Sequence, residues 1–201
     1  MGLLSSSVSF VRYSVEGEIP PDFINLADER IKAHAFRDID ESFEETSIGW
    51  VSVMNMFDTE FAFASFAVGD YIVMTLRIDE RKVSAAAVKK FTLKEEERIK
   101  KERQVPRLSR SHLLEIKENV KLQLMKKAVP LPSVYDVCWN LAQGTLLFFS
   151  TSLKAQELLE NFFKETFGLD LVLQIPYLTA QHLLGQEDQE ALADITPEIF
   201  V

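Results

Sequence analysis

The chain has 201 residues, of which 47% are apolar and 26% are charged, a balance typical of a globular protein rather than a disordered one. Its single cysteine excludes an intramolecular disulfide and a thiolate metal cluster, and no apolar run approaches the ~18 residues that a membrane span needs. The net charge of −9 argues at first sight against a nucleic-acid partner.

The first part of the chain predicts a strand, a helix and a second strand. Ser7–Val15 alternates between apolar and polar residues, as a half-buried strand does. Pro20-Pro21 favours a helix start, and apolar residues at four-residue spacing then continue the helix to about Phe36. A strand is expected over Gly49–Met54.

A β-hairpin is predicted next. The strands Glu60–Val68 and Tyr71–Ile78 are separated by Gly69-Asp70, and Gly tolerates the positive φ of a tight turn. Phe61 and Phe63 are expected on one buried face of the first strand.

The chain then changes character and predicts a pair of helices. Val83–Arg103 is rich in strong helix formers, but it is too polar beyond its start to lie flat on a core. A break containing Pro106 follows, and Ser111 is the expected N-cap of a second helix, His112–Ala128. Two helices joined by a short break predict a helical hairpin that projects from the protein.

Strands and a helix return in the last part of the chain. Ser133–Trp139 and Thr145–Ser150 predict a second β-hairpin, and Ser152 and Gly168 bracket a helix, Leu153–Phe167. A strand over Leu169–Ile175 and a short helix near Thr179–Leu184 complete the elements.

The predicted fold class is α+β, with two small sheet-and-helix units and a projecting basic helical hairpin between them. The predicted divisions are residues 1–80 for the first unit, 81–129 for the hairpin, 130–185 for the second unit and 186–201 for an acidic tail.

The charge is divided between two parts of the chain. Residues 81–130 hold 15 Lys and Arg against 6 Asp and Glu, a local charge of +9, whereas the other residues hold 7 basic and 25 acidic groups. Such asymmetry bears on binding partners and not on fold. The predicted hairpin is therefore the candidate surface for an anionic partner.

Basic residues recur at helical spacing in this hairpin. Spacings of four, four and three place four cations on one side of the first helix, two more share a side of the second, and three mark the tip. The candidate DNA-binding residues are Lys90, Lys94, Arg98, Lys101, Arg103, Arg107, Arg110, Lys117 and Lys121. Cations in such rows can follow the phosphates of double-stranded DNA, and no element for reading bases is present, so binding without sequence preference is expected.

Two alternatives are compatible with the same residues. Glutamates four residues before lysines, as in Glu96–Lys100 and Glu97–Lys101, are also typical of a solvated helix face. The alternative function is a protein-interaction module that uses the hairpin to dock an acidic partner or to form a coiled dimer.

The sequence predicts no catalytic centre, metal site or cofactor. Asp70, Asp79, Glu80 and Lys82 have the residue types of a Mg²⁺-dependent nuclease, but their spacing also fits an ordinary polar strand end. The three histidines fall on separate predicted helices without a second ligand nearby, and Cys138 fits a small apolar residue in a strand. A cytoplasmic location is expected.

Several segments resemble the recombination-associated RdgC family of bacteria. They are Gly49-Trp50-Val51, the run Arg77-x-Asp79-Glu80-Arg81-Lys82-Val83 leading into Val88-Lys89, Leu124-Met125-Lys126-Lys127-Ala128, and Gly144-Thr145-Leu146 through Ser152, Ala155 and Glu157. The resemblance implies a ring-shaped homodimer, associated with the nucleoid, that encircles duplex DNA and restrains recombinase filament formation. The helical hairpin would be the finger that helps to close the ring. Family members are usually longer, so a short member lacking the C-terminal part is expected. The family is sometimes labelled an exonuclease, but the resemblance supplies no catalytic motif.

Overall fold

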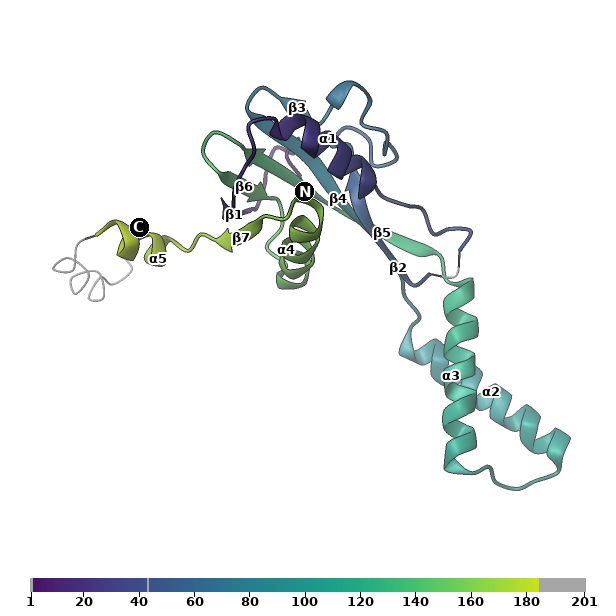
Figure 1. The fold of residues 1–201 in the computed structure, drawn as a ribbon. Helices are drawn as coiled ribbons and strands as arrows, with labels where there is room; N and C mark the ends of the chain where they lie inside the picture. The colour runs from purple at the N-terminus through teal and green to yellow at the C-terminus, as the bar shows by residue number, and fades with distance from the viewer. Residues whose placement is uncertain (1, 43, 185–201) are drawn as a thin grey trace.

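The computed structural model describes residues 2–42 and 44–184, and its strands form one antiparallel sheet (Figure 1). The strand order is β2-β4-β5-β6-β1-β7, and the short β3 pairs with β4. The strands are β1 (Val11–Glu16), β2 (Thr46–Val51), β3 (Ala67–Val68), β4 (Tyr71–Arg81), β5 (Pro130–Asn140), β6 (Thr145–Phe148) and β7 (Asp170–Leu173).

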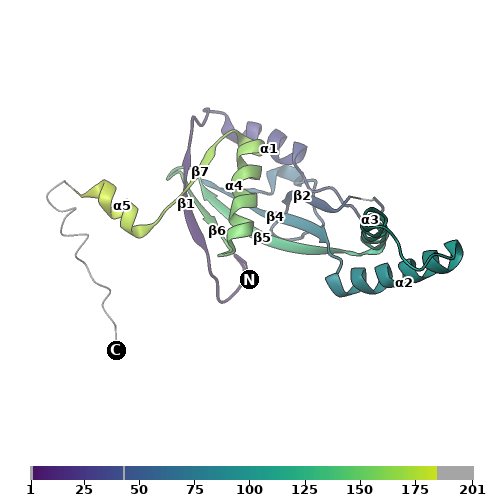
Figure 2. The same cartoon turned by 90° about the horizontal axis from the view of Figure 1, so that it is seen from below.

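Five α-helices and one short 3₁₀ helix occur among the described residues. They are α1 (Phe23–Ala33), η1 (Ala62–Ala64), α2 (Ala85–Arg103), α3 (Arg110–Lys127), α4 (Leu153–Phe167) and α5 (Pro176–Leu183). Helices α2 and α3 extend away from the sheet at one end of the molecule, and α5 lies at the other end (Figures 1 and 2).

The main core lies between one face of the sheet and helices α1 and α4. Trp139 of β5 contacts both helices, with its ring centroid 5.1 Å from that of Phe23 and 5.2 Å from that of Phe163. Trp50 of β2 donates from Nε1 to Thr166 Oγ1 of α4 at 3.0 Å. Because strand side chains alternate between faces, the buried residues of β4 and β5 recur at every second position on this side.

The predicted α+β class is confirmed, and its two halves share one sheet. Strand β4 from the first predicted unit pairs with β5 from the second over eleven residues, from Tyr71↔Asn140 to Arg81↔Pro130. The helical hairpin, α2 with α3, is thus inserted between two paired strands. The predicted acidic tail, 186–201, lies outside the described residues.

The prediction of a long strand over Glu60–Val68 is wrong. Only Ala67–Val68 pairs as a strand, because Phe61, Phe63 and Ala64 all have left-handed backbone conformations, with φ of 49°, 56° and 50°. This path breaks the alternation of a strand. Phe61 is buried and Phe63 is fully exposed, so the predicted common buried face is also absent.

The second hairpin helix begins two residues before the predicted start. Ser109, and not Ser111, is its N-cap, and Ser109 Oγ accepts a hydrogen bond from His112 N at 3.3 Å. By contrast, α4 spans the predicted Leu153–Phe167, and Gly168 ends it with φ of 71°. An αL C-cap of this kind favours glycine because it has no Cβ.

The opposite face of β4 carries a row of buried charges. Arg77 and Asp79 are 5% and 2% exposed, and Arg77 donates to both Asp79 carboxylate oxygens at 2.8 and 2.7 Å. The Arg77 guanidinium also lies over the Phe36 ring, 4.1 Å from its centroid. Hydrogen bonding to Asp79 raises the pKa of Arg77 above its ordinary value.

Arg81 lies at the root of the helical hairpin and is 6% exposed. Its guanidinium donates to backbone carbonyl oxygens of two separate segments. One is the loop before β2, with Ile39, Asp40, Ser42 and Glu44, and the other is Ala128, directly after α3. One buried side chain therefore fastens the end of α3 to the sheet and to this loop.

Candidate nucleic-acid interface

The helical hairpin is held together by a narrow apolar seam and by its caps. Val88 and Thr92 of α2 and Ile116 and Val120 of α3 are the buried residues of the two helices. Ser84 Oγ caps α2 by accepting from Ala87 N at 3.2 Å. Since so few positions face the seam, most of the surface of both helices is left to solvent.

All nine candidate DNA-binding residues are exposed. Four lie along α2, two lie on α3, and three surround the tip where the helices join. The α2 set is Lys90, Lys94, Arg98 and Lys101, the α3 set is Lys117 and Lys121, and the tip set is Arg103, Arg107 and Arg110.

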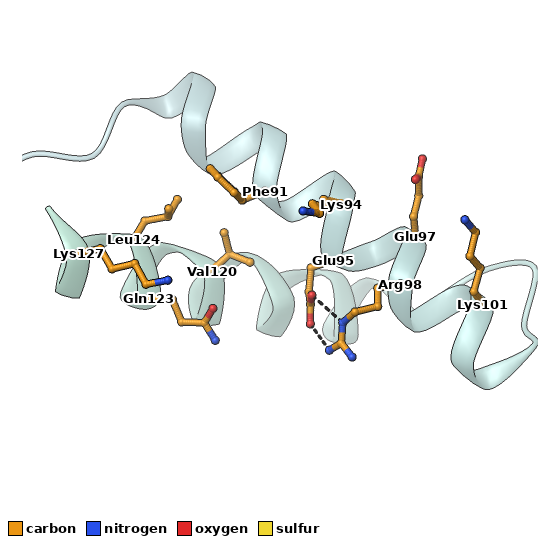
Figure 3. A pocket seen from close by; sticks show the side chains of 10 residues that line it. All are labelled: Phe91, Lys94, Glu95, Glu97, Arg98, Lys101, Val120, Gln123, Leu124 and Lys127. Atoms are coloured by element: carbon orange, nitrogen blue, oxygen red, sulfur yellow. Dashed lines mark hydrogen bonds and ion pairs between the residues drawn. The ribbon is translucent and has the colours of Figure 1, made fainter.

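A groove runs between the helices on one flank of the hairpin, and Figure 3 shows the side chains around it. We call it the Arg98 groove; it encloses about 580 Å³. Its lining residues are Phe91, Lys94, Glu95, Glu97, Arg98, Lys101, Val120, Gln123, Leu124 and Lys127. Three of the predicted α2 cations therefore do lie together.

The charge of Arg98 is largely compensated by its own helix. Its guanidinium bonds both carboxylate oxygens of Glu95, as Figure 3 shows, and Nη1 donates to Glu102 Oε1 at 2.6 Å. These hydrogen bonds raise the pKa of Arg98, and the bond from Arg98 lowers the pKa of Glu95. Lys94, Lys101 and Lys127, in contrast, form no ion pair with any described carboxylate, so they are the cations of this groove available to an outside anion.

A second groove lies on the other flank, and we call it the Lys117 groove. It encloses about 590 Å³, and its lining residues are Val83, Ala85, Val88, Lys89, Thr92, Leu93, Glu96, Lys117 and Lys121. Its α2 lysine, Lys89, precedes Lys94 by five positions, which is about 140° around an α-helix. The structure therefore does not bring all the candidate cations to one surface; it divides them between two flanks and the tip.

Thr92 gives the floor of the Lys117 groove a buried hydroxyl that lacks a hydrogen-bond partner among the described residues. The residue is 9% exposed. A buried hydroxyl without a partner costs about 1–3 kcal/mol of desolvation.

Thr92→Val is therefore expected to stabilise the protein by about 1 kcal/mol, since it removes this cost at nearly constant shape and helix propensity. Urea unfolding followed by tryptophan fluorescence measures the change. Thr166→Val is the matched control, because Thr166 Oγ1 has two partners, Trp50 Nε1 and Phe162 O, and should lose stability instead. A loss of stability in both variants would contradict the assignment of Thr92.

The residues of the nuclease alternative are not arranged as a metal site. Both oxygens of Asp79 are occupied by Arg77, Glu80 pairs with Lys82 at 3.1 Å and with Lys154 at 3.4 Å, and Asp70 lies at the far end of β4. Within residues 2–42 and 44–184, no group of three or more His, Cys, Asp and Glu side chains is placed to hold a metal ion.

Cys138 and His34 have structural surroundings. Burial raises the pKa of the Cys138 thiol, which disfavours the reactive thiolate form. His34 ends α1, where its Nδ1 lies 2.9 Å from Arg30 O and its ring packs against Phe162.

The buried bonds of Arg77 and Arg81 were not predicted from the sequence. A signal was present, because Arg77, Asp79 and Arg81 alternate along one strand and so share one face. The alternative of an ordinary polar strand end at Asp79–Lys82 does not anticipate that Arg77, Asp79 and Arg81 are buried.

None of the helices formed by the described residues combines the length and apolar character that a bilayer crossing requires. The comparison with curated proteins found no match. The model of one protein family, described as "Putative exonuclease, RdgC", matches residues 10–183 of the 201. A match over most of the chain, including the sheet, α1 and α4 and the helical hairpin, shows that the chain belongs to the RdgC family.

Proposed function

We propose that this protein binds double-stranded DNA without sequence preference, through the cations of its helical hairpin. The observation that carries the proposal is the exposure of all nine candidate cations on an insertion whose local charge is opposite to that of the remaining chain. Membership of a recombination-associated family supports a DNA-directed role.

The chemistry of the surface favours phosphates over bases. Lysine and arginine side chains on exposed helix faces neutralise phosphates and release counterions, which gives affinity without sequence information. Phe91 is the aromatic residue of α2 and α3, and it lies in the Arg98 groove, so successive bases have no row of rings on which to stack.

The family resemblance extends the proposal to a homodimer that surrounds the duplex, associates with the nucleoid and restrains a recombinase. A DNA-bound protein can do this by occupying the duplex on which a recombinase filament grows. Filament assembly on duplex DNA, followed by light scattering, should slow as this protein is added. Sedimentation of the DNA-free protein tests the dimer separately.

The first experiment measures binding of the full chain to a random fluorescent duplex by anisotropy, at about 50 and about 200 mM salt. Tight binding at low salt that weakens steeply at high salt is expected, because each neutralised phosphate contributes about 0.9 to the slope of log affinity against log salt. Absence of binding at both salt concentrations would overturn the proposal.

Paired substitutions on the two flanks show which groove faces the DNA. Lys94→Gln with Lys101→Gln removes two of the three available cations of the Arg98 groove, and Lys117→Gln with Lys121→Gln removes two of the three of the Lys117 groove. A pair that contacts phosphates should flatten the slope by up to about 2, whereas a pair that faces away should leave it nearly unchanged.

The matched control removes two lysines from the body of the protein. Lys32 and Lys164 already pair with Asp28 and Asp170, each at 2.7 Å, so Lys32→Gln with Lys164→Gln should leave the salt slope unchanged. An equal loss of slope in this control and in both hairpin pairs would place DNA binding outside the hairpin.

A protein-docking role for the hairpin is the second candidate, because both grooves combine an apolar floor with cations. It predicts salt-sensitive association with an acidic protein and no affinity for DNA. The anisotropy measurements with the duplex at low and high salt therefore separate the two candidates, because only the DNA-binding candidate predicts binding at low salt. Degradation of linear duplex in the presence of Mg²⁺ would instead support the exonuclease description of the family.

A further inference from the structure

The Lys117 groove differs from the Arg98 groove in the state of its charges. Lys89, Lys117 and Lys121 form no ion pair with any described carboxylate, and the one acidic residue of the groove, Glu96, lies 3.8 Å from Lys100. The Arg98 groove also has three such lysines, Lys94, Lys101 and Lys127, but its Glu97 forms no ion pair with a described residue, and its arginine is shared by two carboxylates, those of Glu95 and Glu102. Of the two, the Lys117 groove therefore offers more uncompensated positive charge.

The floor of this groove is apolar and incompletely covered. Leu93 is 51% exposed beside Val83 and Val88, and Thr92 supplies the buried hydroxyl without a partner. Threonine in a helix has two accessible χ1 rotamers, so this hydroxyl can turn to donate to an anion in the groove. A fitting occupant has carboxylates for the lysines and apolar side chains for the floor.

The same chain contains a segment of that composition. Residues 186–201, the acidic tail, hold five acidic residues and no lysine or arginine, and Leu192, Ile195, Ile199 and Phe200 stand among the acids. Helix α5, which leads into this segment, lies at the opposite end of the molecule from α2 and α3 in both views (Figures 1 and 2). The Lys117 groove of the same copy is therefore remote from α5.

We propose that the Lys117 groove is a docking site for the acidic tail of a second copy of this chain. Carboxylates of the tail pair with Lys89, Lys117 and Lys121, and its apolar side chains cover Leu93 and the groove floor. The consequence for function rests on the proposed DNA binding: the docked tail competes with phosphates for Lys117 and Lys121, so DNA and tail exclude each other there.

The direct test needs no DNA. A carbodiimide joins a carboxylate to an amine that it contacts, so an equal mixture of isotopically light and heavy full-length copies is treated with it and digested for mass spectrometry. Light-to-heavy crosslinks between residues 186–201 and Lys89, Lys117 or Lys121 are expected. Crosslinks confined to one copy, or tail crosslinks to other lysines alone, would overturn the proposal.

Peptide binding provides the second measurement. A fluorescent peptide of residues 186–201 is added to a full-length variant whose own tail acids are replaced by Asn or Gln, which leaves the groove vacant. Its affinity should fall about three- to tenfold with Lys117→Gln and Lys121→Gln, the loss of two exposed ion pairs. The matched pair Lys94→Gln and Lys101→Gln, on the other flank, should change it less than about twofold. Equal losses in both pairs would indicate general charge attraction and contradict a specific groove.

The consequence for DNA is measured last with the same variants. The full chain with a neutralised tail should bind the random duplex more tightly than the unaltered chain. If the peptide binds the groove and no variant binds DNA, the proposed function fails and the docking site remains. If DNA binds and the peptide does not, the docking site fails alone.

Discussion

Asp79→Ala is expected to destabilise the folded protein by about 3–5 kcal/mol, the cost of leaving a buried charge without its partner. Arg77 is 5% exposed, and Asp79 accepts two of its hydrogen bonds at 2.8 and 2.7 Å. Arginine does not escape this cost by losing its proton, because its pKa is far above neutral pH. Urea unfolding followed by fluorescence of the buried Trp50 and Trp139 measures the loss.

Two further variants separate this explanation from a general sensitivity of β4. Asp70→Ala changes an exposed carboxylate just before the same strand, and it should stay within about 0.5 kcal/mol of the unaltered protein. The double variant Arg77→Met with Asp79→Leu should recover most of the lost stability, since apolar residues of similar volume often replace a buried ion pair at little cost. A loss below about 1 kcal/mol for Asp79→Ala would contradict the structural role of the pair.

The same result affects how the exonuclease description is tested. If Asp79→Ala unfolds the protein, a loss of nuclease activity in this variant does not show that Asp79 is catalytic. Asp70→Ala and Glu80→Gln leave the Arg77–Asp79 pair intact, so these variants are the informative ones for a metal-dependent reaction.

Elements whose signals are local were predictable from the sequence. Helix α4 has a serine before it, a glycine after it and an apolar stripe between, and these signals agree with one another. The segment before β3 shows the opposite case. Its alternating phenylalanines suggest a strand, but left-handed conformations at Phe61 and Phe63 depend on how the surrounding chain packs, and local pattern does not contain that information.

For the candidate interface, too, only the features that depend on local sequence were predictable. Exposure of the cations follows from the polarity of the helices, and the grouping of Lys94, Arg98 and Lys101 follows from helical spacing. The division into two grooves depends on how α2 packs against α3, and the compensation of Arg98 depends on two particular rotamers. Neither can be derived from residue spacing alone.

The single sheet was missed because it depends on long-range pairing. Strands β4 and β5 are separated by the whole helical hairpin, yet they pair along their full length. The insertion makes two halves of one sheet look like separate units in the sequence. Loop closure costs free energy that rises only slowly with loop length, so such an insertion is compatible with pairing of its flanking strands.

Arg81→Met is expected to cost about 2–4 kcal/mol and to loosen the helical hairpin from the sheet, because several buried carbonyl oxygens lose their donor at once. The bonds to Ile39 O at 2.7 Å and to Ala128 O join the loop before β2 to the end of α3. Hydrogen exchange should accelerate in the last turn of α3 and in residues 39–42, and urea unfolding gives the change in stability. Lys82→Met is the control, since Lys82 is the exposed next residue with a single ion pair to Glu80, and it should cost less than about 0.5 kcal/mol.

The effect of Arg81→Met on DNA binding distinguishes placing the hairpin from contacting the phosphates. Arg81 is 6% exposed and its donors are engaged by carbonyl oxygens, so it is not available to a phosphate. A loosened hairpin should bind the duplex more weakly, because its orientation must be restored on binding. The slope of log affinity against log salt should stay that of the unaltered protein, because the number of phosphate contacts is the same. Loss of affinity together with a flatter slope would show instead that Arg81 itself meets the DNA, and the buried root described here would be wrong.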